Sequence, residues 1–215
     1  MISQHIPVMK KEAIEALNVR DNLDYIDVTF GGGGYSEEIL KKAKCNLLSL
    51  DKDPTVKNYA KKLKIKYKKR FTFVNDDFEN LESIIKENNK GLVSGGIVAD
   101  LGVSSFQLDD SERGFSFSKD GPLDMRMSRE GVTAQELIYS LNEEELARIL
   151  WDYGDEEKSR AIAKMIIKER NKEVLDTTFK LVKLIKKVKK NNRKKKKTSC
   201  NKIFSGIKNS NQSRT

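Results

Sequence analysis

The stretch Tyr25-Ile-Asp-Val-Thr-Phe-Gly-Gly-Gly-Gly-Tyr-Ser36 decides the fold of this chain of 215 residues. Its first residues are typical of a short apolar strand, four glycines follow, and a helix-like sequence comes after them. Glycine adopts positive φ without steric cost and lets a ligand approach the main chain closely. The free N–H groups at the start of the following helix attract negative charge. The stretch therefore predicts a strand, a ligand-binding turn and a helix.

Three more strand-like runs follow this turn in the sequence. They span 46–50, 71–74 and 96–100, with helix signals between them, and Asp51 and Asp100 stand at the ends of two of them. Strands that alternate with helices predict a parallel, doubly wound α/β sheet, and we expect the strand at 96–100 to be buried in it. An acid at the end of the second strand commonly holds a nucleoside ribose in such folds.

Two nucleoside cofactors fit such a turn. A nicotinamide dinucleotide favours G-x-G-x-x-G, and Ser36 stands here in place of the third glycine. Asp27 and Asp51 also put negative charge on both sides of the turn, which does not suit a diphosphate. S-adenosylmethionine has a sulfonium, an ammonium and a ribose diol that suit these acids, and a carboxylate that suits the helix N-terminus. The pattern favours the methyl donor and leaves open the dinucleotide and a plain turn without a ligand.

The amino-acid composition limits which classes of protein this chain can belong to. With 37% hydrophobic and 34% charged residues, the chain is long enough for one or two domains with cores. The apolar runs are too short to span a membrane, and the spacing of Cys45 and Cys200 does not suit a metal site. A reducing cytoplasm is expected. The net charge is +10, but the part up to Asp176 holds 28 basic and 32 acidic residues, a net of −4, so only the tail is basic.

The sequence changes character after residue 108. A loop rich in Gly, Ser, Asp and Arg is followed by helix signals, with Thr133 and Asn142 as N-caps and Asp155 as the cap of a third helix. A fourth helix is expected over 177–190, with Phe179 on its apolar face. These signals predict a helical domain attached to the sheet domain.

Single residues of this region allow more than one interpretation. We assign Trp151 to the core of the helical domain rather than to base stacking. Four cations of the loop, Arg113, Lys119, Arg126 and Arg129, suit contacts with RNA phosphates. They would serve equally well as partners of the acids inside the same loop.

Five segments of the sequence show a family resemblance. They are HIPVMKKEAIEAL, YIDVTFGGGGYS, LDKD, ADLGVSSFQLDDSERGFSFSKDGPLDMRM and YGDEEKSRAIAKMIIKER. From His5 to about Val188, the chain closely resembles the bacterial ribosomal RNA small-subunit methyltransferase H family. The resemblance implies an S-adenosylmethionine-dependent enzyme that methylates N4 of a cytosine in the decoding region of small-subunit (16S) rRNA. It also implies a cytoplasmic protein with a Rossmann-like class I methyltransferase fold, whose partner is this rRNA or the 30S subunit.

The same resemblance implies which residues form the site. The cofactor-binding positions lie in the glycine turn, at strand ends or shortly after the last strand: Gly33, Gly34, Tyr35, Asp51, Phe78, Asp100 and Gln107. Asp51 is expected at the ribose and Phe78 beside the adenine, and no metal is expected. Asp100 is also the candidate catalytic residue. The sequence departs from the family pattern at Gly32, Tyr35 and Phe106, where Arg, His and Pro are common.

The resemblance stops near residue 191, whereas family members continue with an H-P-A-T-x-x-F-Q-A-L-R-I-A-x-N segment and further strands. Back-translating the tail from Thr198 with AT-rich codons and shifting the frame by one base gives HPATKYFQALRIAINQE. The run Lys194 to Lys197 would be encoded by an adenine tract, where a base is easily lost or gained. We therefore expect a frameshift-derived tail, a sheet that is incomplete at its C-terminus, and an enzyme of impaired activity.

Three regions result from this interpretation. They are an S-adenosylmethionine-binding α/β domain over 1–108, a helical substrate-recognition insertion over 109–190, and a basic, disordered tail over 191–215. Two other functions stay open at this point. One is a nicotinamide-dependent oxidoreductase, and the other is a non-catalytic RNA-binding protein that uses the basic tail.

Overall fold

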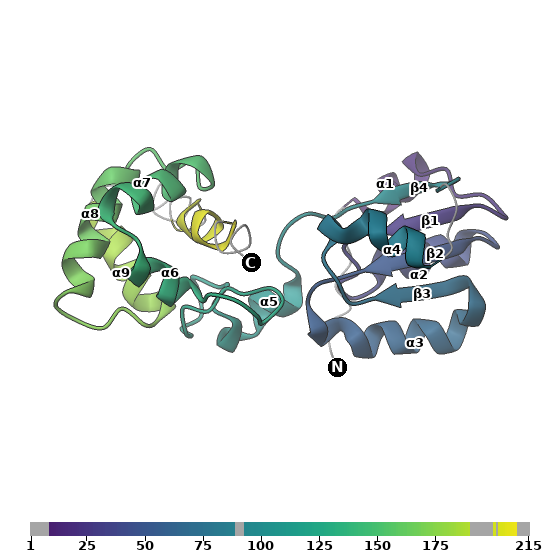
Figure 1. The fold of residues 1–215 in the computed structure, drawn as a ribbon, viewed down its shortest axis with the longest axis horizontal. Coiled ribbons are helices and arrows are strands. Elements are labelled where there is room, and N and C mark those ends of the chain that lie inside the picture. Colours follow the sequence, from purple (N-terminus) through teal and green to yellow (C-terminus); the bar gives the residue numbers. More distant parts are fainter. Residues whose placement is uncertain (1–8, 89–92, 190–199, 201, 210–215) are drawn as a thin grey trace. The chain divides into compact units, whose positions relative to one another are not determined.

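The computed structural model describes residues 9–88, 93–189, 200 and 202–209. The chain divides into two compact units, residues 1–102 and 103–215, which we call the sheet unit and the helical unit (Figure 1). Each unit has hydrophobic cores of its own. The boundary falls at Gly102, shortly before the change in composition at residue 108.

The sheet unit contains a four-stranded parallel sheet with helices between its strands. The strands are β1 (Asp24–Asp27), β2 (Asn46–Leu50), β3 (Phe71–Val74) and β4 (Gly96–Val98), in the order β3-β2-β1-β4. The helices are α1 (Lys10–Ala16), α2 (Gly34–Lys42), α3 (Lys57–Tyr67) and α4 (Leu81–Glu87), with 3₁₀ turns η1 (Pro54–Val56), η2 (Lys68–Arg70) and η3 (Phe78–Asn80). This order is that of the first four strands of a Rossmann-type sheet. The prediction of an α/β fold is confirmed.

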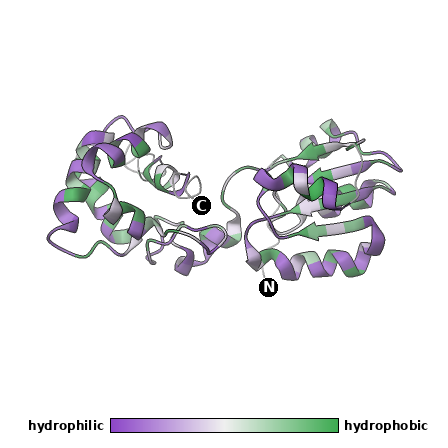
Figure 2. Ribbon diagram, viewed as in Figure 1, coloured by the Kyte–Doolittle hydropathy of each residue, from purple (hydrophilic) through white to green (hydrophobic). Residues whose placement is uncertain are grey.

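Helices cover both faces of this sheet. Successive strand residues point to opposite faces, so Tyr25 and Leu47 join one core, in which residues of α2 and α3 are buried. Ile26 and Leu48 join a second core with Ile84 of α4. Figure 2 shows hydrophobic residues along these strands and largely hydrophilic residues along α3. The sheet is therefore doubly wound.

Strand β4 differs from the sequence prediction. A buried strand was expected over 96–100, but the strand covers only Gly96–Val98 and the side chain of Ile97 is 50% exposed. Among the described residues β4 pairs with β1 alone, so its outer edge has no strand neighbour there. An edge strand with one neighbour buries less of its surface than a central strand does.

The helical unit contains α5 (Ser105–Asp109), the 3₁₀ turn η4 (Ser111–Arg113), α6 (Ala134–Ser140), α7 (Glu143–Asp152), α8 (Ser159–Arg170) and α9 (Thr178–Val188). Thr133 and Asn142 form the expected capping boxes of α6 and α7. The predicted cap at Asp155 is wrong, since that residue has a φ of 49° and α8 has Lys158 as its N-cap residue. The carboxylate of Asp155 instead pairs with Lys202.

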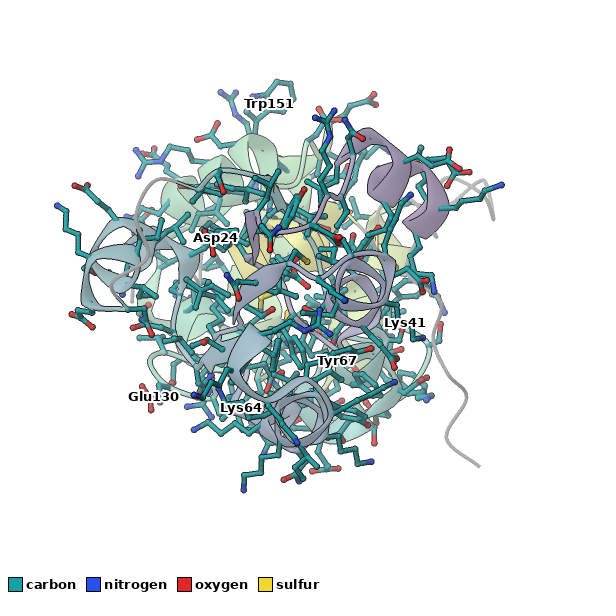
Figure 3. The ribbon with its side chains drawn as sticks, turned by 90° about the vertical axis from the view of Figure 1, so that its right-hand side faces the viewer. Asp24, Lys41, Lys64, Tyr67, Glu130 and Trp151 are labelled. Atoms are coloured by element: carbon teal, nitrogen blue, oxygen red, sulfur yellow. The ribbon has the colours of Figure 1, made fainter. Side chains whose placement is uncertain are left out.

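Two aromatic residues of this unit were wrongly assigned to its core. Trp151 is 55% exposed and projects outward in Figure 3, because α7 buries the other side, with Leu146 and Leu150. Phe179 of α9 is 47% exposed, because that helix buries Leu181 and its neighbours on a face turned away from Phe179. Apolar spacing predicted this helix and the burial of Val182 and Ile185, and it was wrong for Phe179.

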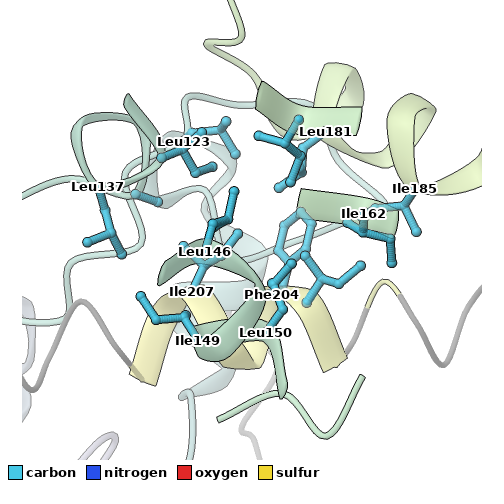
Figure 4. Packing of buried hydrophobic residues seen from close by; sticks show 14 of the residues in the cluster. Leu123, Leu137, Leu146, Ile149, Leu150, Ile162, Leu181, Ile185, Phe204 and Ile207 are labelled. Carbon is cyan, nitrogen blue, oxygen red and sulfur yellow. The ribbon is translucent and has the colours of Figure 1, made fainter. Parts of the chain in front are cut away.

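Part of the tail belongs to the core of the helical unit. Residues 202–209 are helical, and three of their side chains, Ile203, Phe204 and Ile207, are buried in the same core as Leu146 and Leu150 of α7 (Figure 4). The rings of Phe204 and Phe117 meet edge to face with centroids 6.3 Å apart. Most of the basic run, from 190 to 199, lies outside the described residues.

The tail and α7 meet at a glycine. A Cβ atom on Gly154 would lie 2.5 Å from the backbone oxygen of Lys202 and 2.7 Å from that of Leu150. Gly206 makes a similar approach, since its Cβ would lie 3.3 Å from the backbone of Gly154. Only the absence of side chains at these positions allows the two backbones to come so close.

Candidate functional site

The candidate site lies at the carboxyl edge of the sheet. The glycine turn follows β1, Asp51 follows β2, Phe78 begins η3 after β3, and Asp100 comes after β4 (Figure 1). Parallel strands bring all four positions to one edge. The strand order reverses between β1 and β4, and sheets of this kind bind their ligands at such a reversal.

The glycine turn is held on both sides by the backbone. Phe30 donates its N–H to the carbonyl of Leu50 at 2.8 Å, and Gly33 donates to the carbonyl of Phe30 at 2.7 Å. Gly31 and Gly33 have φ values of 51° and 78°. A Cβ on Gly33 would also lie 2.9 Å from the ring of Phe30. The left-handed conformation and the close ring together explain why glycine is needed here.

Gly33 is the N-cap residue of α2, and Gly34 and Tyr35 are its first two residues. The N–H groups of a first helical turn have no acceptors within the helix. The ring of Tyr35 is buried in the core of the sheet unit. Burial raises the pKa of Tyr35, and the charges of Asp100 and Asp27 raise it further. The expected contact of this stretch with a ligand is therefore a main-chain contact.

Asp51 links the glycine turn to the end of β2. Its Oδ2 atom accepts the N–H of Gly31 at 2.7 Å, and its Oδ1 atom accepts the N–H of Asp53 at 2.9 Å. Its backbone carbonyl accepts from Nδ2 of Asn75 at 2.6 Å. Burial raises the pKa of the Asp51 carboxyl. Each carboxylate oxygen has two lone pairs, so the group can hold the turn and still accept hydroxyl groups of a ribose.

Phe78 offers an apolar surface at the same edge. The residue is 43% exposed, and the preceding Asp77 caps its 3₁₀ turn by accepting from the N–H of Glu79. Asp77 also pairs with Lys52 at 2.8 Å, which ties the loop after β3 to the loop after β2. An exposed aromatic face at this place fits a planar base such as adenine.

Asp100 is attached to the turn through its backbone. Its N–H donates to Oγ1 of Thr29 at 2.6 Å, while its side chain is exposed. The charge of Asp100 raises the pKa of both Asp27 and Tyr35. The Asp100 carboxylate is therefore close enough to the glycine turn to change the pKa of the groups on either side of it.

Asp27, one of the two acids beside the turn, is buried, and the sequence did not predict its burial. Asp27 is fully buried at the end of β1, where its Oδ2 accepts from Oγ of Ser36 at 2.7 Å and its Oδ1 from the N–H of Thr29 at 3.1 Å. Burial raises its pKa to about 6, although both hydrogen bonds act in the opposite direction. The signal in the sequence was a charged residue inside an otherwise apolar strand.

Gln107 belongs to the helical unit. It lies in α5, where its Oε1 atom accepts the N–H of Ser104 at 3.0 Å and completes a capping box. The structure thus brings together the predicted site residues of the sheet unit and places Gln107 in the other unit. Its expected contact with the methionine end of a cofactor stays a prediction.

The cations of the loop after α5 have partners inside the loop. Arg113 is buried and donates through one nitrogen to the carbonyls of Arg126 and Met127, at 2.9 Å each. Arg126 binds the carboxylate of Asp124, with a shortest contact of 2.6 Å. Lys119 and Arg129 pair with Asp109 and Asp110. These contacts favour the structural interpretation of the four cations over phosphate binding.

Two other features are absent from residues 9–88, 93–189, 200 and 202–209. In this part of the chain, His, Cys, Asp and Glu side chains form no group of three that could bind a metal ion. No helix in it is long and apolar enough to cross a membrane.

The chain is similar to known proteins over most of its length. The model of the MraW methylase family matches residues 2–210. Enzymes named ribosomal RNA small subunit methyltransferase H are 46% identical in Rickettsia massiliae and 45% identical in Rickettsia rickettsii, over 186 residues in each case. These matches cover 86% of this chain and 59% of each relative, so the chain spans about three fifths of their length.

Solved structures match as well. One of them is coclaurine N-methyltransferase bound to N-methylheliamine and SAH, with 10% identity and a TM-score of 0.33 over 93% of this chain and 64% of that protein.

Proposed function

This chain belongs to the MraW methylase family, and on that premise we propose that it binds S-adenosylmethionine at the carboxyl edge of its sheet to methylate small-subunit ribosomal RNA. The observation that carries the proposal is the 2.7 Å hydrogen bond between Asp51 and Gly31. It joins an acid suited to a ribose to a turn suited to a methionine carboxylate, and this turn follows β1, from which the strand order reverses toward β4. The relatives named above support the choice of rRNA as the substrate.

The residues present fit the chemistry of this methyl donor. Its ribose diol matches the remaining lone pairs of Asp51, and its adenine matches the exposed face of Phe78. Its carboxylate matches the N-terminus of α2 at Gly34, and its cationic groups match the exposed carboxylate of Asp100. A diphosphate would meet these same acids with unfavourable charge. When bound, the donor supplies an electrophilic methyl group on a sulfonium.

We further propose N4 of a cytosine in the decoding region as the methylated atom. An exocyclic amine conjugated to the ring is a poor nucleophile, so the enzyme has to orient it. Asp100 is exposed at the end of β4 and is suited to accept a hydrogen bond from that amine. Such a bond would aim the nitrogen lone pair at the methyl carbon, and catalysis would consist mainly of positioning.

The outer edge of β4 bears on how fast this chain can transfer methyl groups. Ile97 on β4 is half exposed and β4 has one strand neighbour among the described residues, so the edge of the sheet next to Asp100 is uncovered there. We propose that the chain binds the donor weakly and transfers methyl groups slowly, in the cytoplasm, with rRNA or the 30S subunit as its partner.

Calorimetric titration tests the cofactor. S-adenosylmethionine or its demethylated product should bind to the chain, and NADH should not. NADH binding tighter than the methyl donor would overturn the proposal in favour of an oxidoreductase. RNA binding that survives removal of residues 1–176 and falls steeply with salt would favour the RNA-binding alternative.

Methyl transfer tests the reaction. Undermethylated small subunits and labelled donor are offered to the chain, to a version with the reading frame restored after Lys197, and to the relative from Rickettsia massiliae as positive control. The restored version should transfer methyl groups to cytosine N4 much faster than the chain itself. Equal rates would show that the chain of 215 residues suffices, and methylation of another atom would overturn the N4 assignment.

A further inference from the structure

A buried chain of hydrogen bonds crosses the carboxyl edge of the sheet. Oγ of Ser36 donates to Oδ2 of Asp27 at 2.7 Å and lies 2.8 Å from Oγ of Ser49. The N–H of Thr29 donates to Oδ1 of Asp27 at 3.1 Å, and Oγ1 of Thr29 accepts the N–H of Asp100 at 2.6 Å. These contacts connect β2, α2, β1 and the segment after β4.

Burial makes this arrangement rigid. Asp27, Ser36 and Ser49 are fully buried, Thr29 is half-buried and Asp100 is exposed. A buried polar group that lost its partner would bear the full cost of desolvation, so each inner member is held in one geometry. Because a serine hydroxyl has one proton and Ser36 gives it to Asp27, Ser49 is the donor to Ser36 when Asp27 is ionised. The rigid end of the network lies in the core and its outer end is Asp100.

We propose that Thr29 is a positioning residue: its N–H is anchored on the buried carboxylate of Asp27, and its hydroxyl fixes the backbone of Asp100 beside the glycine turn. The proposal rests on the proposed function in so far as Asp100 serves the transferred methyl. Thr29 itself need not touch substrate or cofactor. A valine has nearly the same shape and would leave the N–H of Asp100 without this acceptor.

The ionisation of Asp27 depends on the charged groups around it. Asp27 is faced by Ser36 and Tyr35 from α2, by Asp51 from the end of β2 and by Asp100 from the end of β4. Burial raises its pKa to about 6, and the carboxylates of Asp51 and Asp100 add to the effect. Ionisation of Asp27 should therefore change the resonances of two backbone amides, those of Thr29 and Asp100.

Amide resonances of the full chain, followed by NMR from about pH 4 to pH 8, test the coupling without any ligand. In the wild type, the amides of Thr29 and Asp100 should both show a transition near pH 6, and Asp27→Asn should remove it from both. Thr29→Val should keep the transition at residue 29 and lose it at residue 100, whereas Thr29→Ser should keep both. Absence of the transition from the wild-type Asp100 amide, or its persistence in Thr29→Val, would overturn the proposal.

Donor titration supplies the second measurement. Thr29→Val should weaken S-adenosylmethionine binding by about three- to tenfold, the value of one hydrogen bond, and Thr29→Ser should restore it. Thr72→Val on β3 is the matched control and should bind like the wild type. Equal weakening by Thr72→Val would mean a general loss of structure and would overturn the assigned role. If the wild type bound no donor while Thr29→Val still uncoupled the Asp100 amide, the proposed function would fail and the positioning role would stand.

Discussion

Asp51 at the end of β2 holds Gly31 of the turn after β1 through a hydrogen bond of 2.7 Å between its Oδ2 atom and the glycine N–H. The bond joins two neighbouring strands at the edge where a ligand would lie. Because Oδ1 accepts the N–H of Asp53 at the same time, both oxygens of this half-buried carboxylate are fixed in direction. An acid held in this way is preorganised for a ribose, and it also shapes the turn.

Replacing Asp51 by alanine should therefore weaken cofactor binding by about 1–3 kcal/mol, since the turn loses its anchor and the ribose loses its acceptor. Asp51→Asn keeps one acceptor oxygen and should lose less. Calorimetric titration with S-adenosylhomocysteine measures both. Asp21→Ala is the control, because Asp21 also accepts a backbone N–H, from Lys44, but precedes β1. A loss in the control as large as in Asp51→Ala would contradict the assigned role.

Asp27 should make stability fall as the pH rises. Its pKa is raised by burial from 3.8 to about 6, so in that window the folded chain binds more protons than the unfolded chain. The contribution of Asp27 to the free energy of unfolding therefore decreases from about pH 4 to pH 6, by roughly 3 kcal/mol at most.

Asp27→Asn cannot ionise and should lack this decrease. Urea unfolding of both proteins at about pH 4, 5, 6 and 7.5 gives the unfolding free energy of each. Subtracting the value of the variant from that of the wild type removes the contribution of groups that titrate alike in both proteins. That difference should fall with pH and then become constant. A difference that rises with pH would show that the folded chain favours the ionised form of Asp27.

Arg113 should be needed for stability and not for RNA affinity. It is buried and donates to the carbonyls of Arg126 and Met127. Arg113→Met would leave these two carbonyls without their donor, and we expect a loss of about 2–4 kcal/mol in unfolding free energy. Arg148→Met on the exposed side of α7 is the control and should change stability by less than about 0.5 kcal/mol. Similar small losses from both variants would refute the structural role.

The tail should be part of the stable core of the helical unit. Phe204 is buried and its ring meets that of Phe117, so Phe204→Ala should lower the unfolding free energy by about 3–5 kcal/mol. The neighbouring Ser205 is exposed, and Ser205→Ala should have almost no effect. Thermal unfolding of the full chain compares the two. Equal melting temperatures for both variants and the wild type would show that the tail does not pack there in solution.

Strand β4 should promote self-association. Its outer edge has no strand neighbour in the part of the chain that the structure describes, and this edge and the half-exposed Ile97 offer main-chain hydrogen bonds and apolar surface to another chain. Ile97→Lys should slow the growth of light scattering at raised temperature, because a charged side chain at an edge opposes pairing. Ile65 on α3 is more exposed but lies on a helix, so Ile65→Lys is the matched control and should leave the scattering rate nearly unchanged. An equal reduction by both would point to net charge as the cause.

Much of the sheet unit could be predicted because its signals are local. The strands at 46–50 and 71–74 were predicted at their observed bounds, and Asp53 caps a turn that begins at Pro54, as expected. Such signals depend on neighbouring residues alone: apolar runs for strands, and side-chain oxygens that bind backbone N–H groups at helix starts. The same holds for the capping box at Thr133.

The errors concern residues whose surroundings come from distant parts of the chain. Trp151 and Phe179 have apolar side chains at helical spacing, yet the core lies on other sides of their helices. Ile97 is apolar and half exposed, because β4 is an edge strand. Spacing along a helix or strand shows that a face is apolar, but which elements cover it depends on packing.

The sequence by itself determined the alternation of strands and helices, the glycine turn with positive φ, the acids at the strand ends and, through these motifs, the family. Those properties follow from steric and hydrogen-bonding rules that act within a few residues. Only the tertiary structure decided that Asp27 is buried with Ser36 and Thr29, that Asp51 binds Gly31, and that the loop arginines hold their own loop. The strength and the pKa of a polar group depend on how completely it is removed from water and which partners replace the water. Both are set by residues that meet only when the chain folds.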